Sequence, residues 1–225
     1  PNRAEANVAN LQLGKCAGRV ALLGLLAIAL AAPAAAHHPL GGATPATFWH
    51  GFLSGIGHPV IGFDHLAFVI GAGIASAFVG PRYLMPAVFI AATIAGCLIA
   101  LSAGPLPQLE LVIAASVTLI GIMVLSGRSI AAPVYFVLFA IAGVFHGGAY
   151  AAAVVGAEAT PIAAYLIGFA LIQYAIAATA TLVTAETWKA ASATALQPRL
   201  AGAFIAGIGA TFLIEHIEKL AFPGM

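Results

Sequence analysis

The sequence predicts an all-α, polytopic membrane protein, in which an N-terminal signal segment precedes a bundle of six transmembrane helices. Of its 225 residues, 62% are hydrophobic and only 7% are charged, whereas a soluble domain is about half apolar and a quarter charged. The apolar residues form continuous runs of about twenty, the length that a helix needs to cross a bilayer. Barrel strands instead alternate polar and apolar residues. The membrane domain must therefore be helical.

Residues 1–36 are typical of a secretory signal. Three basic residues come first, an apolar run at residues 20–32 is too short to span a bilayer, and three alanines at residues 34–36 offer a cleavage site. We therefore expect a signal at residues 1–36 and a six-span membrane domain at residues 37–225. An uncleaved first helix, kinked at Pro33, is the alternative.

Six apolar segments follow, separated by breaks rich in proline and glycine. No connection between them is long enough to form a domain, and none carries a nucleotide-binding loop. Energy for transport must come from a gradient, from the membrane potential or from a partner. The expected spans are residues 47–79, 83–103, 107–127, 131–151, 160–185 and 199–221.

The distribution of positive charge predicts the orientation of these spans. The first, third and fifth connections contain Arg82, Arg128, Lys189 and Arg199, and the two connections between them contain no lysine or arginine. Positively charged connections stay in the cytoplasm. The mature N-terminus, at His37, is therefore expected in the periplasm, and the protein in the bacterial inner membrane.

The first span is too long to be one straight helix. Residues 45–79 would reach about 52 Å as a helix, against a hydrocarbon core of about 30 Å. Proline cannot donate a helical hydrogen bond and disfavours helix at the residue before it. We therefore expect a break near Pro59, at residues 57–59, with Thr44 and Pro45 beginning the preceding short helix.

The break lies among the residues that indicate function. His58, Asp64 and His65 belong to the half of the first span that faces the periplasm, and an ionisable residue inside a span is by default functional. Imidazole and carboxylate ligands without thiolates suit nickel, cobalt or zinc. Asp64 either binds the metal or orients a histidine. In the structural alternative, His58 caps a helix end and Asp64 pairs with His65.

His146 in the fourth span is the fourth candidate metal ligand, and the adjacent Gly147 permits close helix approach. A second group of candidates could bind metal or gate its passage, although Glu215 could instead bridge Lys219 one turn away. This second group is Glu215, His216, Glu158 and His37. In the fifth span, Gln173 and Tyr174 are pore-lining candidates with a simpler use in interhelical hydrogen bonding.

Residues 58–65 read HPVIGFDH, which resembles the HPxxGxDH signature in the first span of the HupE/UreJ family of nickel/cobalt permeases. Pro59 and Gly62 are fixed positions of that motif. The resemblance implies a cleavable signal, six spans, and Ni²⁺ or Co²⁺ as the transported ion, with no permanently bound cofactor.

A second element of that family, FHGxAHGxE in the fourth span, is only partly matched. Residues 145–149 fit, but Tyr150 replaces the second histidine, and a glutamate occurs only at Glu158. The match therefore supports His146 more strongly than Glu158.

These observations predict a permease, not an enzyme, that carries Ni²⁺ or Co²⁺ from periplasm to cytoplasm through a His/Asp site. Its expected partners are the ion and the bilayer, with a homo-oligomer or a membrane complex left open. A net charge of +1 gives no basis for nucleic-acid binding. A non-transporting, metal-binding accessory subunit and an intramembrane enzyme or haem protein remain alternatives, although no nucleophile–base set or haem motif is visible.

Overall fold

The computed structural model describes residues 43–222, and all regular secondary structure in this part of the chain is helical. The signal segment and His37 lie outside the described residues. The helices are α2 (Phe48–Ile61), α3 (Phe63–Ser76), α4 (Leu84–Ala103), α5 (Leu109–Ser126), α6 (Ala132–Ala151), η2 (Ala152–Val154), α7 (Ala159–Leu182), η3 (Val183–Thr187) and α8 (Leu196–Ala221).

The helices confirm the predicted polytopic membrane bundle. Five are long and apolar enough to cross a bilayer, namely α4, α5, α6 with η2, α7 with η3, and α8. The pair α2 and α3, bent by 79°, is apolar enough to form either a broken sixth span or a re-entrant loop. Each helix of that pair has 14 residues, or about 21 Å, so neither crosses the roughly 30 Å hydrocarbon core alone.

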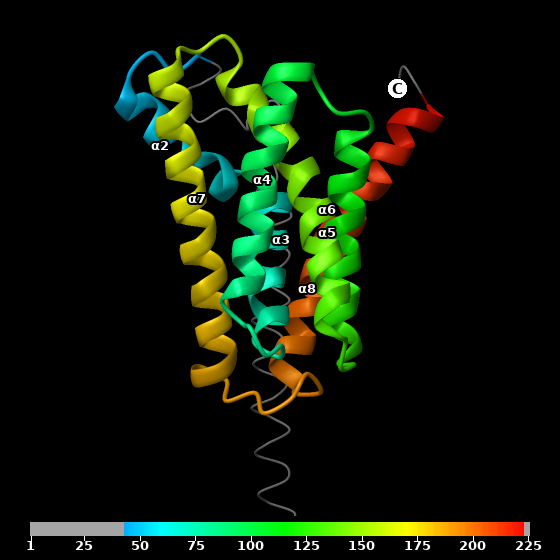
Figure 1. Ribbon diagram of the computed structural model, residues 1–225. Helices are drawn as coiled ribbons and strands as arrows, with labels where there is room; N and C mark the ends of the chain where they lie inside the picture. Colours follow the sequence, from blue (N-terminus) through cyan, green and yellow to red (C-terminus); the bar gives the residue numbers. More distant parts are fainter. Residues whose placement is uncertain (1–42, 223–225) are drawn as a thin grey trace, which may run out of the picture. The chain divides into compact units, whose positions relative to one another are not determined.

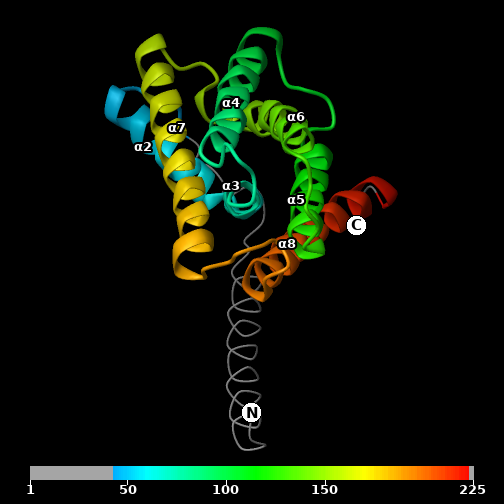
Figure 2. The ribbon, with the colours of Figure 1, turned by 60° about the horizontal axis from the view of Figure 1, so that its bottom comes forward.

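Helix α3 lies at the centre of the bundle, and the other helices surround it (Figure 2). Three pairs make the most extensive contacts, α5 with α8, α4 with α6, and α2 with α7, while α3 also packs against α5, α7 and α8. At the break between α2 and α3, Gly62 is buried while Ile61 and Phe63 on either side of it are exposed. Irregular backbone at membrane depth is tolerated where it is buried in protein.

Small residues bring the paired helices close together. A Cβ atom added at Gly55 would collide with the carbonyl of Tyr165, and one added at Gly96 would collide with the carbonyl of Val144. Gly121 meets the backbone of Ala206 in the same way. Helices in lipid gain little from the hydrophobic effect and depend on such close packing.

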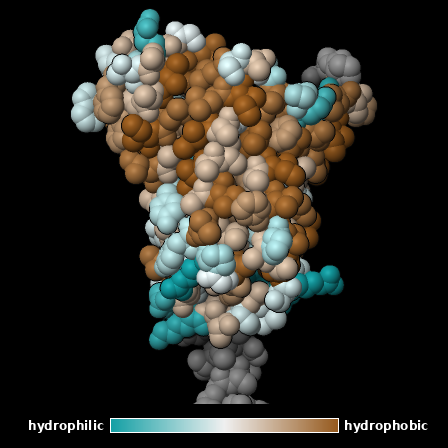
Figure 3. All heavy atoms as spheres, viewed as in Figure 1, coloured by the Kyte–Doolittle hydropathy of each residue, from teal (hydrophilic) through white to brown (hydrophobic). Residues whose placement is uncertain are grey.

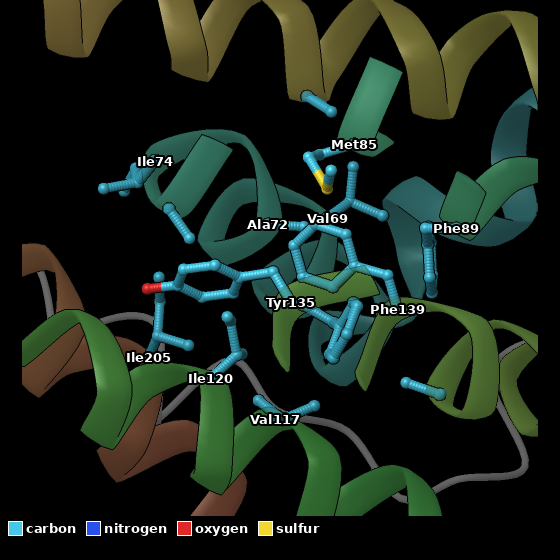
Figure 4. Close-up of a cluster of buried hydrophobic side chains, with 14 of the residues drawn as sticks. Val69, Ala72, Ile74, Met85, Phe89, Val117, Ile120, Tyr135, Phe139 and Ile205 are labelled. Carbon is cyan, nitrogen blue, oxygen red and sulfur yellow. The ribbon is translucent and has the colours of Figure 1, made fainter. Parts of the chain in front are cut away.

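The largest buried cluster surrounds α3 and joins side chains of α4, α5, α6 and α8 (Figure 4). Val69, Ile120 and Phe139 in this cluster are almost completely buried. The outward helix faces carry exposed leucine, isoleucine and phenylalanine, and Figure 3 shows them as a broad apolar surface with most hydrophilic residues toward its lower end. Such a surface suits a lipid environment.

The connections at residues 77–83, 127–131 and 188–195 share one end of the bundle (Figure 1). They contain Arg82, Arg128 and Lys189. Arg199 lies in the first turn of α8, not in a connection, and its Nε donates to the carbonyl of Leu125 at 3.0 Å. The basic residues expected to face the cytoplasm therefore gather at this end.

The break in the first span differs from the prediction by three residues. Pro59 lies inside α2, which continues to Ile61, and the chain turns at Gly62. The missing N–H of Pro59 removes only one helical bond, and the N–H of Gly62 still donates to the carbonyl of His58 at 3.1 Å. One more turn therefore forms before the break.

The predicted start of the first helix was wrong. Thr47, not Thr44, precedes the helix, and its Oγ1 accepts the backbone N–H of His50 at 3.1 Å. Thr47 has the extended backbone of an N-cap residue, and its hydroxyl satisfies one of the N–H groups that a helix start leaves unpaired.

Candidate metal centre

The turn at Gly62 separates His58 at the end of α2 from Asp64 and His65 in the first turn of α3. Asp64 is buried, and its Oδ1 accepts the backbone N–H of His65 at 2.8 Å. A carboxylate in this position also interacts favourably with the positive end of the helix dipole. The bend brings the rings of His58 and His65 together, with centroids 5.9 Å apart.

His65 meets His146 across the interior of the bundle. Their Nδ1 atoms are 2.8 Å apart, and both side chains are buried. Helix α6 supplies His146, which is 81 residues further along the chain. Its Nε2 lies 3.0 Å from the hydroxyl of Ser116 in α5, so α3, α5 and α6 all contribute to one polar cluster.

His58 joins this cluster through two tyrosines. Its Nδ1 lies 2.9 Å from the hydroxyl of Tyr165 in α7, and the same hydroxyl donates to the carbonyl of Tyr150 at 2.9 Å. The ring of Tyr150 packs on both His58 and His65, with centroid distances of 5.0 Å and 4.6 Å. We call His58, Asp64, His65 and His146, with Tyr150 between the rings, the histidine cluster.

The Tyr150 side chain is held from α7. Its hydroxyl donates to Oε1 of Gln173 at 3.4 Å, and Nε2 of Gln173 donates to the carbonyl of Phe169 at 3.1 Å. Gln173 is completely buried. Its bond to Tyr150 joins two helices, which is the simpler of the two roles expected for Gln173 from the sequence. Tyr174 is 39% exposed and borders an apolar groove between α4 and α7.

Three buried phenylalanines pack together next to His146. Phe68 packs against His146, with centroids 4.8 Å apart, and against Phe89 at the same separation. Phe139, two turns before His146 in α6, lies 6.0 Å from Phe68. All three side chains are buried. We call Phe68, Phe89 and Phe139 the phenylalanine layer.

The second group of candidates lies elsewhere or outside the described residues. Glu158 is exposed and precedes α7 as its N-cap residue. Glu215 accepts a hydrogen bond from Lys219 at 2.8 Å, which is the bridge left open from the sequence. His216 lies beside it in α8, and its buried Nε2 has no hydrogen-bond partner among the described residues. His37 precedes the described part of the chain.

The structure brings three of the four principal candidates into contact through their rings, namely His58, His65 and His146. Asp64 is adjacent, with its carboxylate bonded to the backbone. Within residues 43–222, no three side chains of histidine, cysteine, aspartate or glutamate are arranged to hold a metal ion in this conformation. An ion would therefore have to rearrange the side chains of the histidine cluster.

Sequence reasoning missed Ser116 and Tyr165 as members of the site. Both are buried, and each contacts a histidine from another helix. The signal that could have found them is a hydroxyl group in an apolar span, because such a group needs a hydrogen-bond partner within the protein. The identity of that partner is not readable from a single span.

Comparison with known proteins identifies the family of this chain. The family described as HupE / UreJ protein matches residues 25–212, which include α2 through most of α8. The chain belongs to the HupE/UreJ family. The HupE/UreJ match covers the whole histidine cluster, including the HPVIGFDH segment at the break.

One curated HupE/UreJ relative is Protein HupE from Rhizobium leguminosarum bv. viciae, 29% identical over 121 residues. The aligned region covers 53% of this chain and 61% of the relative, so the similarity spans less than two thirds of that protein. No solved structure matches the chain significantly.

Proposed function

We propose that this protein is a permease that takes up Ni²⁺ or Co²⁺ from the periplasm through the histidine cluster. Two independent lines support the proposal. Membership of the HupE/UreJ family supports it because that family is associated with nickel and cobalt transport. The chemistry of the buried side chains also supports it, since imidazole nitrogens suit these ions.

The observation that carries the proposal is the distance between His65 and His146. Two nitrogens bonded to one ion at about 2.1 Å, at a right angle, lie about 3 Å apart. The two Nδ1 atoms are already 2.8 Å apart. An ion that replaces the shared proton would lie to one side of the line between the two nitrogens, so each ring would have to turn to point its lone pair at the ion.

His58 and Asp64 are the proposed further ligands. The ring of His58 lies beside that of His65, on the break where the backbone can adjust. The Asp64 carboxylate occupies the first turn of α3, one residue from His65. A hydrated ion would exchange waters for these groups one at a time, and Asp64 would offset part of its charge.

The arrangement of charge supports the direction of transport. Arg82, Arg128 and Lys189 lie at one end of the bundle, which the positive-inside rule assigns to the cytoplasm. The histidine cluster lies toward the other end of the same helices, with His65 in the first turn of α3 and His146 in the last two turns of α6, whereas the basic connections follow α3 and precede α6. In the proposed topology the ion reaches the cluster from the periplasm.

Uptake of radiolabelled nickel and cobalt by cells with and without the protein tests this function. The Asp64→Ala variant, verified for expression, is expected to lose metal accumulation. His50→Ala is a matched control, because His50 is an exposed residue in the first turn of α2. Full uptake by Asp64→Ala would contradict the assignment.

Purified protein in liposomes separates transport from binding alone. A permease should move the metal into the vesicle lumen, whereas an accessory subunit would bind the metal and never release it inside. Metal retained at the protein, with none in the lumen, would favour the accessory-subunit alternative.

A further inference from the structure

Two hydroxyl groups contact the histidine cluster from neighbouring helices. Ser116 Oγ lies 3.0 Å from His146 Nε2 and 2.7 Å from the carbonyl oxygen of Ile113. Tyr165 Oη lies 2.9 Å from His58 Nδ1 and 2.9 Å from the carbonyl oxygen of Tyr150. Each hydroxyl therefore bridges a site histidine and a backbone carbonyl.

The number of protons decides the direction of these hydrogen bonds. A carbonyl oxygen only accepts, and a hydroxyl has a single proton to donate. Ser116 donates that proton to Ile113, and Tyr165 donates its proton to Tyr150. Each hydroxyl oxygen must then accept from its histidine, so the facing ring nitrogen carries hydrogen.

The protonated nitrogen fixes the position of the lone pair in each neutral ring. His146 carries hydrogen on Nε2, so its lone pair is on Nδ1, the atom that faces His65. His65 must then donate from its own Nδ1. His58 carries hydrogen on Nδ1, and its lone pair is on Nε2.

We propose that Ser116 and Tyr165 are positioning residues, which set the tautomers of His146 and His58 so that Nδ1 of His146 and Nε2 of His58 carry the lone pairs that a metal ion would bind. This inference rests on the proposed function. Side chains that hold the far nitrogen of a metal-binding histidine orient the ring, and their removal typically lowers metal affinity about 10–100-fold. A comparable loss is expected here.

The direct test reads the tautomers in metal-free protein. NMR of protein labelled with ¹⁵N-histidine, in lipid nanodiscs, distinguishes protonated from unprotonated ring nitrogens, and His58→Ala and His146→Ala assign the signals. In the unsubstituted protein, His146 should carry hydrogen on Nε2 and His58 on Nδ1. Ser116→Ala should shift His146 toward a mixture of tautomers, and Tyr165→Phe should do the same for His58.

Matched controls separate this role from general packing. Ser76→Ala removes another buried hydroxyl, which donates to the carbonyl of Ala72. Tyr135→Phe removes a buried phenol outside the histidine cluster. Both controls should leave the tautomers and the Co²⁺ affinity unchanged. Ser116→Thr keeps a hydroxyl and should retain the wild-type tautomer. Should Ser116→Ala not fold, Ser116→Cys takes its place, because cysteine is similar in size to serine and its sulfur is a weak acceptor. Ser116→Cys is then expected to change the His146 tautomers in the same way.

The outcomes distinguish this inference from the proposed function. Hydrogen on Nδ1 of His146 in the unsubstituted protein, or unchanged tautomers and Co²⁺ affinity in Ser116→Ala and Tyr165→Phe, would overturn the inference. Tautomers that respond as expected, in a protein that moves no metal into liposomes, would leave the positioning roles standing and reject the transport function.

Discussion

His65 and His146 share one hydrogen bond across the centre of the bundle, with their Nδ1 atoms 2.8 Å apart. The bond joins the first turn of α3 to the last turns of α6. Both rings also pack against aromatic side chains, Tyr150 on His65 and Phe68 on His146. Part of the polar environment of each histidine therefore depends on the other.

This dependence predicts non-additive effects on stability. His65→Ala or His146→Ala removes one member of this buried hydrogen bond, which costs about 1–3 kcal/mol. The double variant removes both partners and should cost less than the sum of the two single variants. Unfolding in detergent, followed by circular dichroism, measures all three. Additive losses would show that the two rings are not coupled.

Gly147 is predicted to be essential for the packing that positions His146. A Cβ atom at Gly147 would collide with the carbonyl of Thr93 in α4, so Gly147→Ala should destabilise the protein by about 1–3 kcal/mol and reduce uptake. Gly207→Ala in α8 is the control, because a Cβ there meets nothing within 4 Å. That change should preserve stability, or raise it by up to about 1 kcal/mol through helix propensity. Equal effects of both variants on unfolding and uptake would contradict this explanation.

Tyr150→His is predicted to strengthen metal binding. Tyr150 occupies the position of the second imidazole in the family element, and its ring already contacts His58 and His65. An imidazole there would add a nitrogen ligand, and affinity for Ni²⁺ should rise about tenfold or more, equivalent to at least about 1.4 kcal/mol. Calorimetry of purified protein measures this Ni²⁺ affinity. Tyr150→Phe, which removes only the hydroxyl bonded to Gln173, should show no such gain.

Glu186→Gln should leave uptake unchanged. Glu186 lies at the opposite end of the bundle from Glu158. Its carboxylate pairs with Arg82 at 4.0 Å, and the Glu186 side chain is 68% exposed. Exposed pairs of this kind contribute up to about 1 kcal/mol. Asp64→Ala and Glu186→Gln both remove one carboxylate charge. Their comparison in the same uptake assay therefore isolates the effect of where the carboxylate lies. A similar loss in the two variants would show that uptake also needs a carboxylate at the end of the bundle where Glu186 lies.

The hydropathy of the sequence predicted the spans well, because lipid requires continuous apolar helices wherever the chain crosses. The break was predicted from Pro59, but the turn occurred at Gly62 because a single missing N–H does not end a helix. Thr44 and Thr47 both precede the first helix. Only the hydroxyl of Thr47 accepts a backbone N–H of that helix, from the residue three positions later.

The histidines were predictable, but their partners were not. An ionisable group within an apolar span is conspicuous in any sequence, which identified Asp64, His65 and His146. The Tyr165–His58 contact joins residues 107 positions apart, and it depends on how α2 packs on α7 around Gly55. Such pairing follows from three-dimensional packing and leaves no periodic signal in either span.

The phenylalanine layer has a consequence for the rate of uptake. Three closely packed aromatic rings offer no ligand and exclude water, and such constrictions block ions by dewetting. In the proposed direction of uptake, an ion that leaves His146 for the cytoplasm meets these rings first. Inward release then requires Phe68, and with it α3, to move aside. The slow step of a transport cycle in this bundle is therefore expected to be a helix rearrangement, and smaller residues at Phe68 should turn a gated permease into a leak.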